Sequence, residues 1–290
     1  MTRIVEGLSE ISDRYATLYC DLWGCLHDGV RPFDEAMTAL TRYRARGGRV
    51  VLLTNAPRPR AEVAAQLDRM GVPRDCWDAV ATSGDGARVA LFEGAVGRRV
   101  RFIGEDRDAP FLVPPKLVAD PVAIDLVDWD AADGIACTGP EDPRADPERY
   151  RADFEAAVAR GLPFLCANPD IEVDRGDSRE WCAGALARIY EALGGHVLYF
   201  GKPHAPAYDL ARRRLVEAGG DPEAPVLAVG DGVLTDVAGA AAAGIDALFV
   251  TGGLARAETR TDHSPEPDLL DAYLARHGAA PAYAVRMLRD

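Results

Sequence analysis

The chain has 290 residues, enough for one large or two modest domains, and its 48% hydrophobic and 27% charged residues are ordinary for a globular protein. A net charge of −13 argues against nucleic acid or an anionic membrane as the main partner, because their phosphates would be repelled. The six cysteines form no C-x-x-C pair, and the sequence has neither a signal-peptide pattern nor an apolar run near the roughly 18 residues of a membrane span. We therefore expect a cytoplasmic protein with reduced, buried thiols, in which a local positive pocket could still bind one small phosphate.

Short β-rich runs alternate with helical patterns in the first and last thirds of the chain. Strands are expected at 17–22, 49–53, 80–82, 197–200, 226–229 and 247–250, and helices at 33–45, 60–70 and 207–218. This alternation predicts a parallel sheet with helices on both faces, the doubly wound α/β architecture.

The middle of the chain has a different texture, with proline-rich linkers and acidic clusters. It contains its own strand candidates at 99–103, 134–138 and 163–167. We interpret residues 84–179 as an α/β module inserted between the third and fourth strands of the core. Residues 1–83 and 180–290 would then form the core domain.

Polar residues follow several of the predicted core strands at their carboxyl ends. Asp21, Thr54, Lys202 and Asp231 all occupy such positions, and ligands of parallel α/β sheets bind beyond these ends. Lys202 is conspicuous because only two of the 33 basic residues are lysines. We expect these four residues to converge on one crevice.

This set of side chains suits phosphoryl transfer. Such a site needs a carboxylate nucleophile, groups that hold the phosphate oxygens, and Mg²⁺ bound by carboxylates and water. Asp21 can be both nucleophile and metal ligand, Asp231 a second ligand, and Asp236 an outer-shell support. Lys202 would offset part of the repulsion between these carboxylates and a phosphate.

The four motifs, in their order, resemble the haloacid dehalogenase (HAD) phosphohydrolase superfamily. They are TLYCDLWG, LLTNAPRP, YFGKPH and VLAVGDGVLTD. The inserted module, with CANPD before GKPH, is similar to the class IIA branch of nucleotide and 4-nitrophenyl phosphatase-like enzymes. The resemblance implies a Rossmann-like core with a C2-type α/β cap, and a Mg²⁺-dependent phosphatase acting on a small phosphorylated metabolite. Caps of this kind often lie near dimer contacts, so a homodimer is one alternative for the assembly.

The resemblance also implies a role for each matching residue. Asp21 would be the phosphorylated nucleophile, and Lys202 would bridge it to the phosphate. The remaining roles are phosphate binding by Thr54 and Asn55, metal binding by the backbone carbonyl of Trp23 and by Asp231, outer-shell support by Asp236, and substrate contact by Asp170, for which a hinge turn is the alternative.

Trp23 departs from the family pattern, which usually has an aspartate there as general acid and base. An indole N–H donates a hydrogen bond but carries out no proton transfer. Losing such a group costs about 10²–10⁴ in rate, so we expect a preference for leaving groups of low pKa. A replacement acid could come from His27, Asp28 or His204.

Two other functions are also compatible with the sequence. One is a catalytically impaired HAD-fold sensor of phosphorylated ligands, or a partner-binding protein, which would keep the phosphate and metal site. The other is a phosphonatase-like hydrolase of C–P bonds, because phosphonoacetaldehyde hydrolases of the superfamily also lack the second aspartate. Both alternatives depend on the absence of an acid at Trp23.

Overall fold

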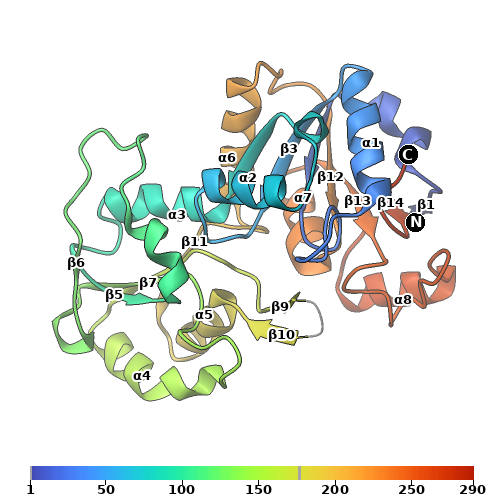
Figure 1. Cartoon of the computed structure of the whole chain (residues 1–290). Helices are drawn as coiled ribbons and strands as arrows, with labels where there is room; N and C mark the ends of the chain where they lie inside the picture. The colour runs from blue at the N-terminus through green and yellow to red at the C-terminus, as the bar shows by residue number, and fades with distance from the viewer. Residues whose placement is uncertain (1, 176–177) are drawn as a thin grey trace. The chain divides into compact units, whose positions relative to one another are not determined.

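The computed structural model describes residues 2–175 and 178–290 and divides the chain into two compact units (Figure 1). We call them the core unit and the inserted unit. The core unit contains Met1–Thr54, Ala64–Ala81 and Lys202–Asp290, and the inserted unit contains Asn55–Val63 and Thr82–Gly201. Each unit has its own parallel sheet.

The core unit is built on a seven-stranded sheet in the order β1-β14-β13-β12-β2-β3-β4. The strands are β1 (Arg3–Ile4), β2 (Thr17–Cys20), β3 (Arg49–Thr54), β4 (Ala79–Thr82), β12 (Val226–Gly230), β13 (Asp246–Val250) and β14 (Tyr283–Val285). The inner strand β2 is buried along its whole length, as expected for a parallel sheet covered on both faces. The predicted Rossmann-like α/β core is confirmed.

Helices pack on this sheet through small and apolar side chains. The core helices are α1 (Asp34–Ala45), α6 (Ala205–Glu217), α7 (Ala238–Ala242) and α8 (Pro267–Arg276), with the π-helical turn η7 (Val233–Val237) before α7. Helix α2 (Arg60–Arg69) belongs to the inserted unit up to Val63 and to the core unit from Ala64. Helix α6 places Tyr208 and Leu215 in one buried cluster with Tyr19 and Val51 of β2 and β3. The segment just before α6 contains Lys202.

The inserted unit has a five-stranded parallel sheet in the order β11-β8-β7-β5-β6. Its strands are β5 (Arg99–Ile103), β6 (Asp125–Leu126), β7 (Gly134–Cys137), β8 (Pro163–Cys166) and β11 (His196–Tyr199), with an antiparallel hairpin of β9 (Glu172–Arg175) and β10 (Ser178–Trp181). Its helices are α3 (Ser83–Phe92), α4 (Arg151–Ala159) and α5 (Ala183–Ala192).

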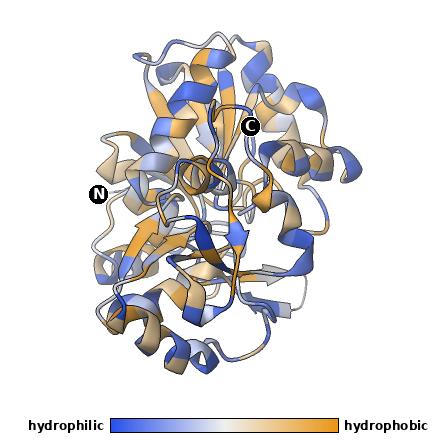
Figure 2. Ribbon diagram, turned by 90° about the vertical axis from the view of Figure 1, so that its left-hand side faces the viewer, coloured by the Kyte–Doolittle hydropathy of each residue, from blue (hydrophilic) through white to orange (hydrophobic). Residues whose placement is uncertain are grey.

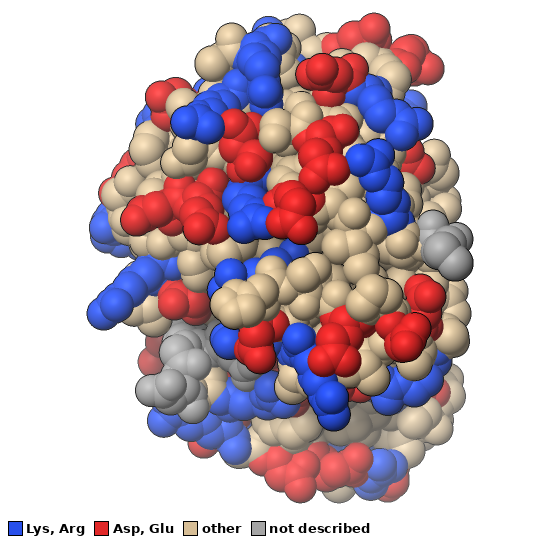
Figure 3. Space-filling view, turned by 90° about the vertical axis from the view of Figure 1, so that its right-hand side faces the viewer, with Lys and Arg blue, Asp and Glu red and all other residues tan. Residues whose placement is uncertain are grey.

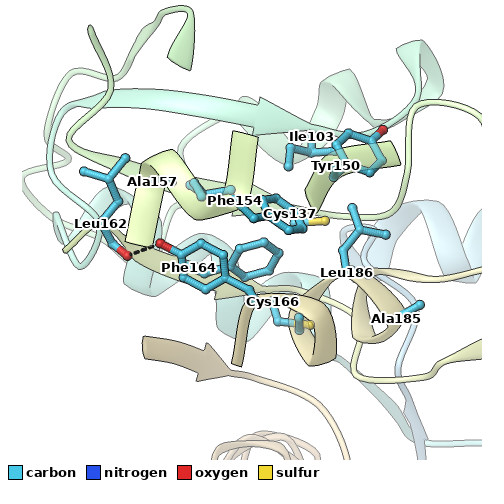
Figure 4. Close-up of a cluster of buried hydrophobic side chains, with 14 of the residues drawn as sticks. Ile103, Cys137, Tyr150, Phe154, Ala157, Leu162, Phe164, Cys166, Ala185 and Leu186 are labelled. Atoms are coloured by element: carbon cyan, nitrogen blue, oxygen red, sulfur yellow. Dashed lines mark hydrogen bonds between the residues drawn. The ribbon is translucent and has the colours of Figure 1, made fainter. Parts of the chain in front are cut away.

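An aromatic cluster gives the inserted unit a core of its own (Figure 4). Phe154 of α4 meets Phe164 of β8 edge to face, with ring centroids 5.9 Å apart. The hydroxyl of Tyr190 in α5 donates a hydrogen bond of 2.6 Å to the carbonyl of Leu162. Helices α4 and α5 are thereby attached to the same part of the sheet.

The prediction that 197–200 forms the fourth core strand is wrong. Strand β11 pairs in parallel with β8, so that Leu198 lies opposite Leu165 in the inserted sheet. The inserted unit therefore extends to Gly201 rather than ending at the predicted boundary of residue 179. A short β-rich run carries no information about which sheet it joins, and here helix α5 returns the chain to the inserted sheet before it re-enters the core.

Hydrophobic colour concentrates on the strands, whereas helices and loops are mixed (Figure 2). On the face shown in Figure 3, acidic and basic side chains are interspersed rather than gathered by sign. All six cysteines are buried and free, as predicted. Within the described residues, no helix combines the length and the apolar character needed to cross a membrane.

Candidate active site

Two of the predicted carboxylates follow neighbouring strands at the centre of the core sheet. Strands β2 and β12 pair in parallel, and the backbone N–H of Asp21 donates to the carbonyl of Val229 over 2.8 Å. Asp231 follows the last residue of β12. The strand register therefore brings Asp21 and Asp231 to the same edge of the sheet, as predicted.

Glycines make room for the carboxylate of Asp231. A Cβ at Gly24 or at Gly253 would lie 2.0 Å from Asp231 Oδ2. Gly24 also has a φ of +70°, a backbone conformation that favours glycine. The backbone N–H of Leu254 donates to the same Oδ2 over 3.1 Å. The loops after β2 and β13 thus close tightly around Asp231.

Lys202 lies between two carboxylates, with Nζ 2.7 Å from Asp21 Oδ1 and 2.7 Å from Asp236 Oδ1. Its side chain is only 3% exposed. The prediction that Lys202 follows a core strand is wrong. It lies in the loop before α6, beside a cis peptide bond to Pro203. Close contact between Pro203 and Gly239 of α7 holds this loop against the core unit.

Asp236 supports Lys202 from the π-helical turn after β12. Its Oδ2 accepts hydrogen bonds from the backbone N–H of Gly232 at 3.1 Å and the hydroxyl of Thr235 at 3.4 Å. A Cβ at Gly230 would lie 2.0 Å from Asp236 Cγ, so the turn can close only over a glycine. These contacts fix one carboxylate oxygen and leave Oδ1 on the ammonium.

Burial and mutual repulsion shape the electrostatics of this cluster. Burial raises the pKa of Asp231 well above its usual range, and the charges of Asp21 and Asp236 raise it further. Burial also raises the pKa of Asp236, to about 6, although Lys202 acts in the opposite direction. Burial alone would lower the pKa of Lys202, but the two carboxylates more than offset it, so the side chain stays an ammonium. With all three carboxylates ionised beside one ammonium, the cluster would carry an excess of negative charge, which a divalent cation would neutralise.

The donor geometry also fits a cation. Ligand atoms of Asp21, Asp231 and Cys25 all lie within 4.8 Å of one another. Burial raises the pKa of Cys25 well above its usual range, so this residue keeps its proton, and hard cations prefer oxygen to a neutral thiol. The residues present therefore fit Mg²⁺ held by Asp21 and Asp231. The sequence predicts no metal-binding role for Cys25. Its position four residues after Asp21 is the only sequence signal that it lies near the site.

The predicted phosphate-binding pair lies where β3 ends. Thr54 closes β3, which pairs with β2, and its side chain is buried. Asn55 follows directly and belongs to the inserted unit. Its side-chain Nδ2 donates a hydrogen bond of 2.8 Å to Oδ1 of Asp170, so these two residues, 115 positions apart, are in contact.

The indole of Trp23 packs back onto its own loop. Its ring lies edge to face with that of His27, with centroids 5.3 Å apart and an interplanar angle of 79°. A Cβ at Gly29, where φ is +88°, would lie 2.2 Å from Trp23 Cζ3. The indole is thus a packing element of the loop that follows Asp21.

The geometry favours structural roles for two of the three predicted replacement acids. His27 is 1% exposed, and its Nδ1 accepts the backbone N–H of Gly29. Asp28 Oδ1 accepts hydrogen bonds from the backbone N–H groups of Val30 and Arg31. Burial acts to raise the pKa of Asp28, but these hydrogen bonds outweigh it and lower the pKa. An ionised carboxylate of low pKa is a poor proton donor at neutral pH. His204 is half-buried at the N-terminal end of α6.

A parallel α/β core with an inserted unit and a buried Asp–Lys–Asp cluster defines a class of hydrolases. The model of the haloacid dehalogenase-like hydrolase family matches residues 18–113, and a HAD-hydrolase-like model matches residues 199–284. A haloacid dehalogenase-like hydrolase from Brucella suis is 39% identical, with a TM-score of 0.82, over 98% of this chain and 100% of that chain. The chain belongs to the haloacid dehalogenase-like hydrolase family.

A relative with a named activity is the D-glycerol 3-phosphate phosphatase of Mycobacterium tuberculosis. It is 28% identical over 249 residues, which cover 85% of this chain and 66% of the relative, just under two thirds of its length. A crystal structure of the glycerol phosphate phosphatase from M. tuberculosis in complex with magnesium has a TM-score of 0.64 and 26% identity, over 89% of this chain and 74% of that chain. A structure in complex with calcium has a TM-score of 0.61 and 26% identity, over 88% and 71% of the chains.

Proposed function

We propose that the chain is a Mg²⁺-dependent phosphatase that hydrolyses a small phosphorylated metabolite through an aspartyl phosphate at Asp21. The observation that carries the proposal is the buried contact of Lys202 with Asp21 and Asp236 at 2.7 Å each, beside Asp231. A buried ammonium can hold both the nucleophile and a phosphate oxygen in place. The phosphatase activity of the M. tuberculosis relative supports the same reaction.

The reaction takes place in two displacements at phosphorus. A carboxylate oxygen of Asp21 forms a bond to phosphorus, and the bond to the leaving oxygen breaks and gives its electron pair to that oxygen, which takes a proton from water. The oxygen of a second water then attacks the aspartyl phosphate, the P–O bond to Asp21 breaks, the carboxylate is regenerated and inorganic phosphate is released. The hydroxide left by the first step takes up the proton that the attacking water loses. Lys202 stabilises the charge that moves between these oxygens, and Thr54 and Asn55 hold the phosphate.

Mg²⁺ would be held by the carboxylates of Asp21 and Asp231, together with the backbone carbonyl of Trp23. When bound, it offsets the repulsion between these carboxylates and the phosphate oxygens. The magnesium and calcium complexes of the M. tuberculosis relative support a divalent cation. Asp236 acts one step away, because it holds Lys202 in place.

The side chain at Trp23 leads us to propose a preference for leaving groups of low pKa, such as acyl, enol or phenol phosphates and diphosphates. An indole packed against His27 and Gly29 supplies no proton to a departing oxygen. The second candidate substrate class is alkyl phosphates, because the M. tuberculosis relative is named for D-glycerol 3-phosphate. The sensor and C–P hydrolase alternatives receive no support from the named relatives.

Turnover of 4-nitrophenyl phosphate with Mg²⁺, compared between wild type and Asp21→Asn, tests the proposed activity. We expect activity in the wild type and its loss in the variant. A series of phosphate esters of rising leaving-group pKa then tests substrate preference, and efficient hydrolysis of alkyl phosphates would refute the preference. Phosphate binding without turnover by the wild type would favour the sensor, and phosphate release from phosphonates would favour C–P cleavage.

We also propose that the inserted unit selects the substrate, and that the protein is cytoplasmic and a homodimer. Exchange of residues in the inserted unit should change KM between substrates while 4-nitrophenyl phosphate turnover persists. Cell fractionation and light scattering of the purified protein test the location and the assembly. A monomer in solution would refute the dimer.

A further inference from the structure

Asn55 makes a contact within the inserted unit that its predicted role does not require. Its Nδ2 donates to Asp170 Oδ1 over 2.8 Å, and the side chain of Asn55 is only 4% exposed. Hydrogen bonds from an amide to an ionised carboxylate are stronger than those between neutral groups. An asparagine amide otherwise rotates broadly about its last torsion, so this bond selects one orientation.

The backbone that presents Asp170 is itself fixed. The N–H of Asp170 donates to Asn168 Oδ1 over 3.1 Å, and its carbonyl accepts the N–H of Gly184 in the first turn of α5 over 3.1 Å. A Cβ at Gly184 would lie 2.1 Å from the carbonyl oxygen of Pro169, so helix and loop are in tight contact. The carboxylate therefore projects from a rigid support.

Gly201 completes the arrangement around Asn55. A Cβ at Gly201 would lie 2.4 Å from Asn55 Oδ1 and 2.4 Å from Pro169 Cδ. Gly201 directly precedes Lys202, as Asn55 directly follows Thr54. Asp170 thus contacts Asn55, and Pro169 contacts Gly201. These two residues of the inserted unit are joined by peptide bonds to Thr54 and Lys202 of the core unit.

We propose that Asp170 is a positioning residue that orients the amide of Asn55 for phosphate and does not itself contact the substrate. This inference rests on the proposed function, in which Asn55 binds the phosphate. It replaces the expectation of a substrate contact, because a carboxylate paired with an amide is not available to a substrate hydroxyl on that oxygen. An anionic carboxylate also repels a phosphate, so direct contact of Asp170 with the phosphate is unfavourable.

A double-mutant cycle on Asn55 and Asp170 tests the proposal, with the dissociation constant of inorganic phosphate measured by calorimetry in the presence of Mg²⁺. Asp170→Ala should weaken phosphate binding by about 5- to 100-fold, a value that lies within the range for coupled neighbouring side chains. Asp170→Asn keeps an acceptor oxygen and should restore binding to within about threefold of wild type. In an Asn55→Ala background, Asp170→Ala should add less than about a twofold effect, because its partner is already gone.

Asp142→Ala is the matched control, since Asp142 is an exposed aspartate of the same unit whose Oδ1 accepts only the local N–H of Arg144 among the bonds described. It should leave phosphate binding unchanged. Equal effects of Asp170→Ala with and without Asn55 would overturn the positioning role. Thermal unfolding of each variant shows whether a loss of binding is caused by misfolding. If Asp170→Ala does not fold, phosphate binding is compared between wild type and Asp170→Asn.

The outcomes separate this inference from the proposed function. Calorimetry with inorganic phosphate needs no turnover, so a wild type that binds phosphate but hydrolyses nothing refutes the proposed function while the cycle still decides the role of Asp170. A wild type that turns over substrate and an additive cycle refute the positioning role alone. A wild type that does not bind phosphate at all overturns both.

Discussion

Replacing Trp23 by aspartate should place a proton donor in the loop that follows Asp21, the proposed nucleophile. The matched variant is Trp23→Asn, which has nearly the same shape and no acidic proton. Both substitutions remove the same indole contacts with His27 and Gly29. The lost packing energy, at most about 3–5 kcal/mol for a fully buried tryptophan, therefore cancels when the two variants are compared.

The quantity to compare is kcat/KM, because it covers only the steps up to departure of the leaving group. For alkyl phosphates, Trp23→Asp should exceed Trp23→Asn by about 10²–10⁴, which is roughly 3–5 kcal/mol of barrier. For 4-nitrophenyl phosphate the two values should agree within about threefold, since this leaving group departs without a proton. Steady-state phosphate release over a series of esters measures both.

The proposed lack of a proton donor at Trp23 is refuted if the aspartate variant is no faster than the asparagine variant on alkyl phosphates while both remain folded. The same holds if wild type already hydrolyses alkyl phosphates as fast as phenyl phosphates. In that case another group supplies the proton, and His204, at the N-terminal end of α6, is the next residue to substitute.

Three further predictions concern the support of the site and of the fold. Lys202→Met should lower kcat/KM by about 10²–10⁴ and lower the melting temperature, because two buried carboxylates lose their shared cation; Lys116→Met, at an exposed position, should change neither. Gly29→Ala should lower the free energy of unfolding by about 1–3 kcal/mol in urea titrations, and by more than Gly47→Ala, which has a similar positive φ but open space around its Cβ. Asp78→Asn should destabilise the protein at neutral pH. Burial acts to raise the pKa of Asp78, but hydrogen bonds from arginines and from a backbone N–H outweigh it, so the pKa is lowered. Stabilisation by this carboxylate is full above its ordinary pKa of about 3.9 and is lost as pH falls through the lower folded value, so the two unfolding curves should converge in acid; a constant gap would contradict it.

The positions of three neighbouring carboxylates could be predicted from the sequence, because two of them follow the ends of core strands. Asp21 and Asp231 come directly after buried β-rich runs, and parallel strands bring such residues to one edge of the sheet. Asp236 lies five residues after Asp231, within the same turn, so its position was also local information. Strand periodicity and short spacing therefore predicted these three carboxylates.

Contacts between distant segments could not be predicted in the same way. The sequence 197–200 reads as a strand, but only its pairing with β8 shows which sheet it joins. The bond between Asn55 and Asp170 depends on how a loop after β8 packs against the first turn of α5. Such a contact joins residues 115 positions apart and leaves no periodic signal.

The charge of the site leads to a final prediction about the order of binding. Asp21, Asp231 and Asp236 are buried around the single ammonium of Lys202, so a phosphate dianion would enter an environment that is already negative. Phosphate should therefore bind much more tightly when a divalent cation is present. By thermodynamic linkage, phosphate must then tighten Mg²⁺ binding by the same factor.

Calorimetric titrations of phosphate with and without Mg²⁺, and of Mg²⁺ with and without phosphate, measure the two sides of this coupling. We expect a factor of about 5–150 in each direction, the usual range for coupled sites, and equal factors from the two experiments. Asp231→Asn removes one proposed cation ligand, so it should reduce the coupling. Phosphate binding that is the same in the presence of a chelator would show that the ammonium alone overcomes the three carboxylates, and the cation would then have no part in holding the substrate.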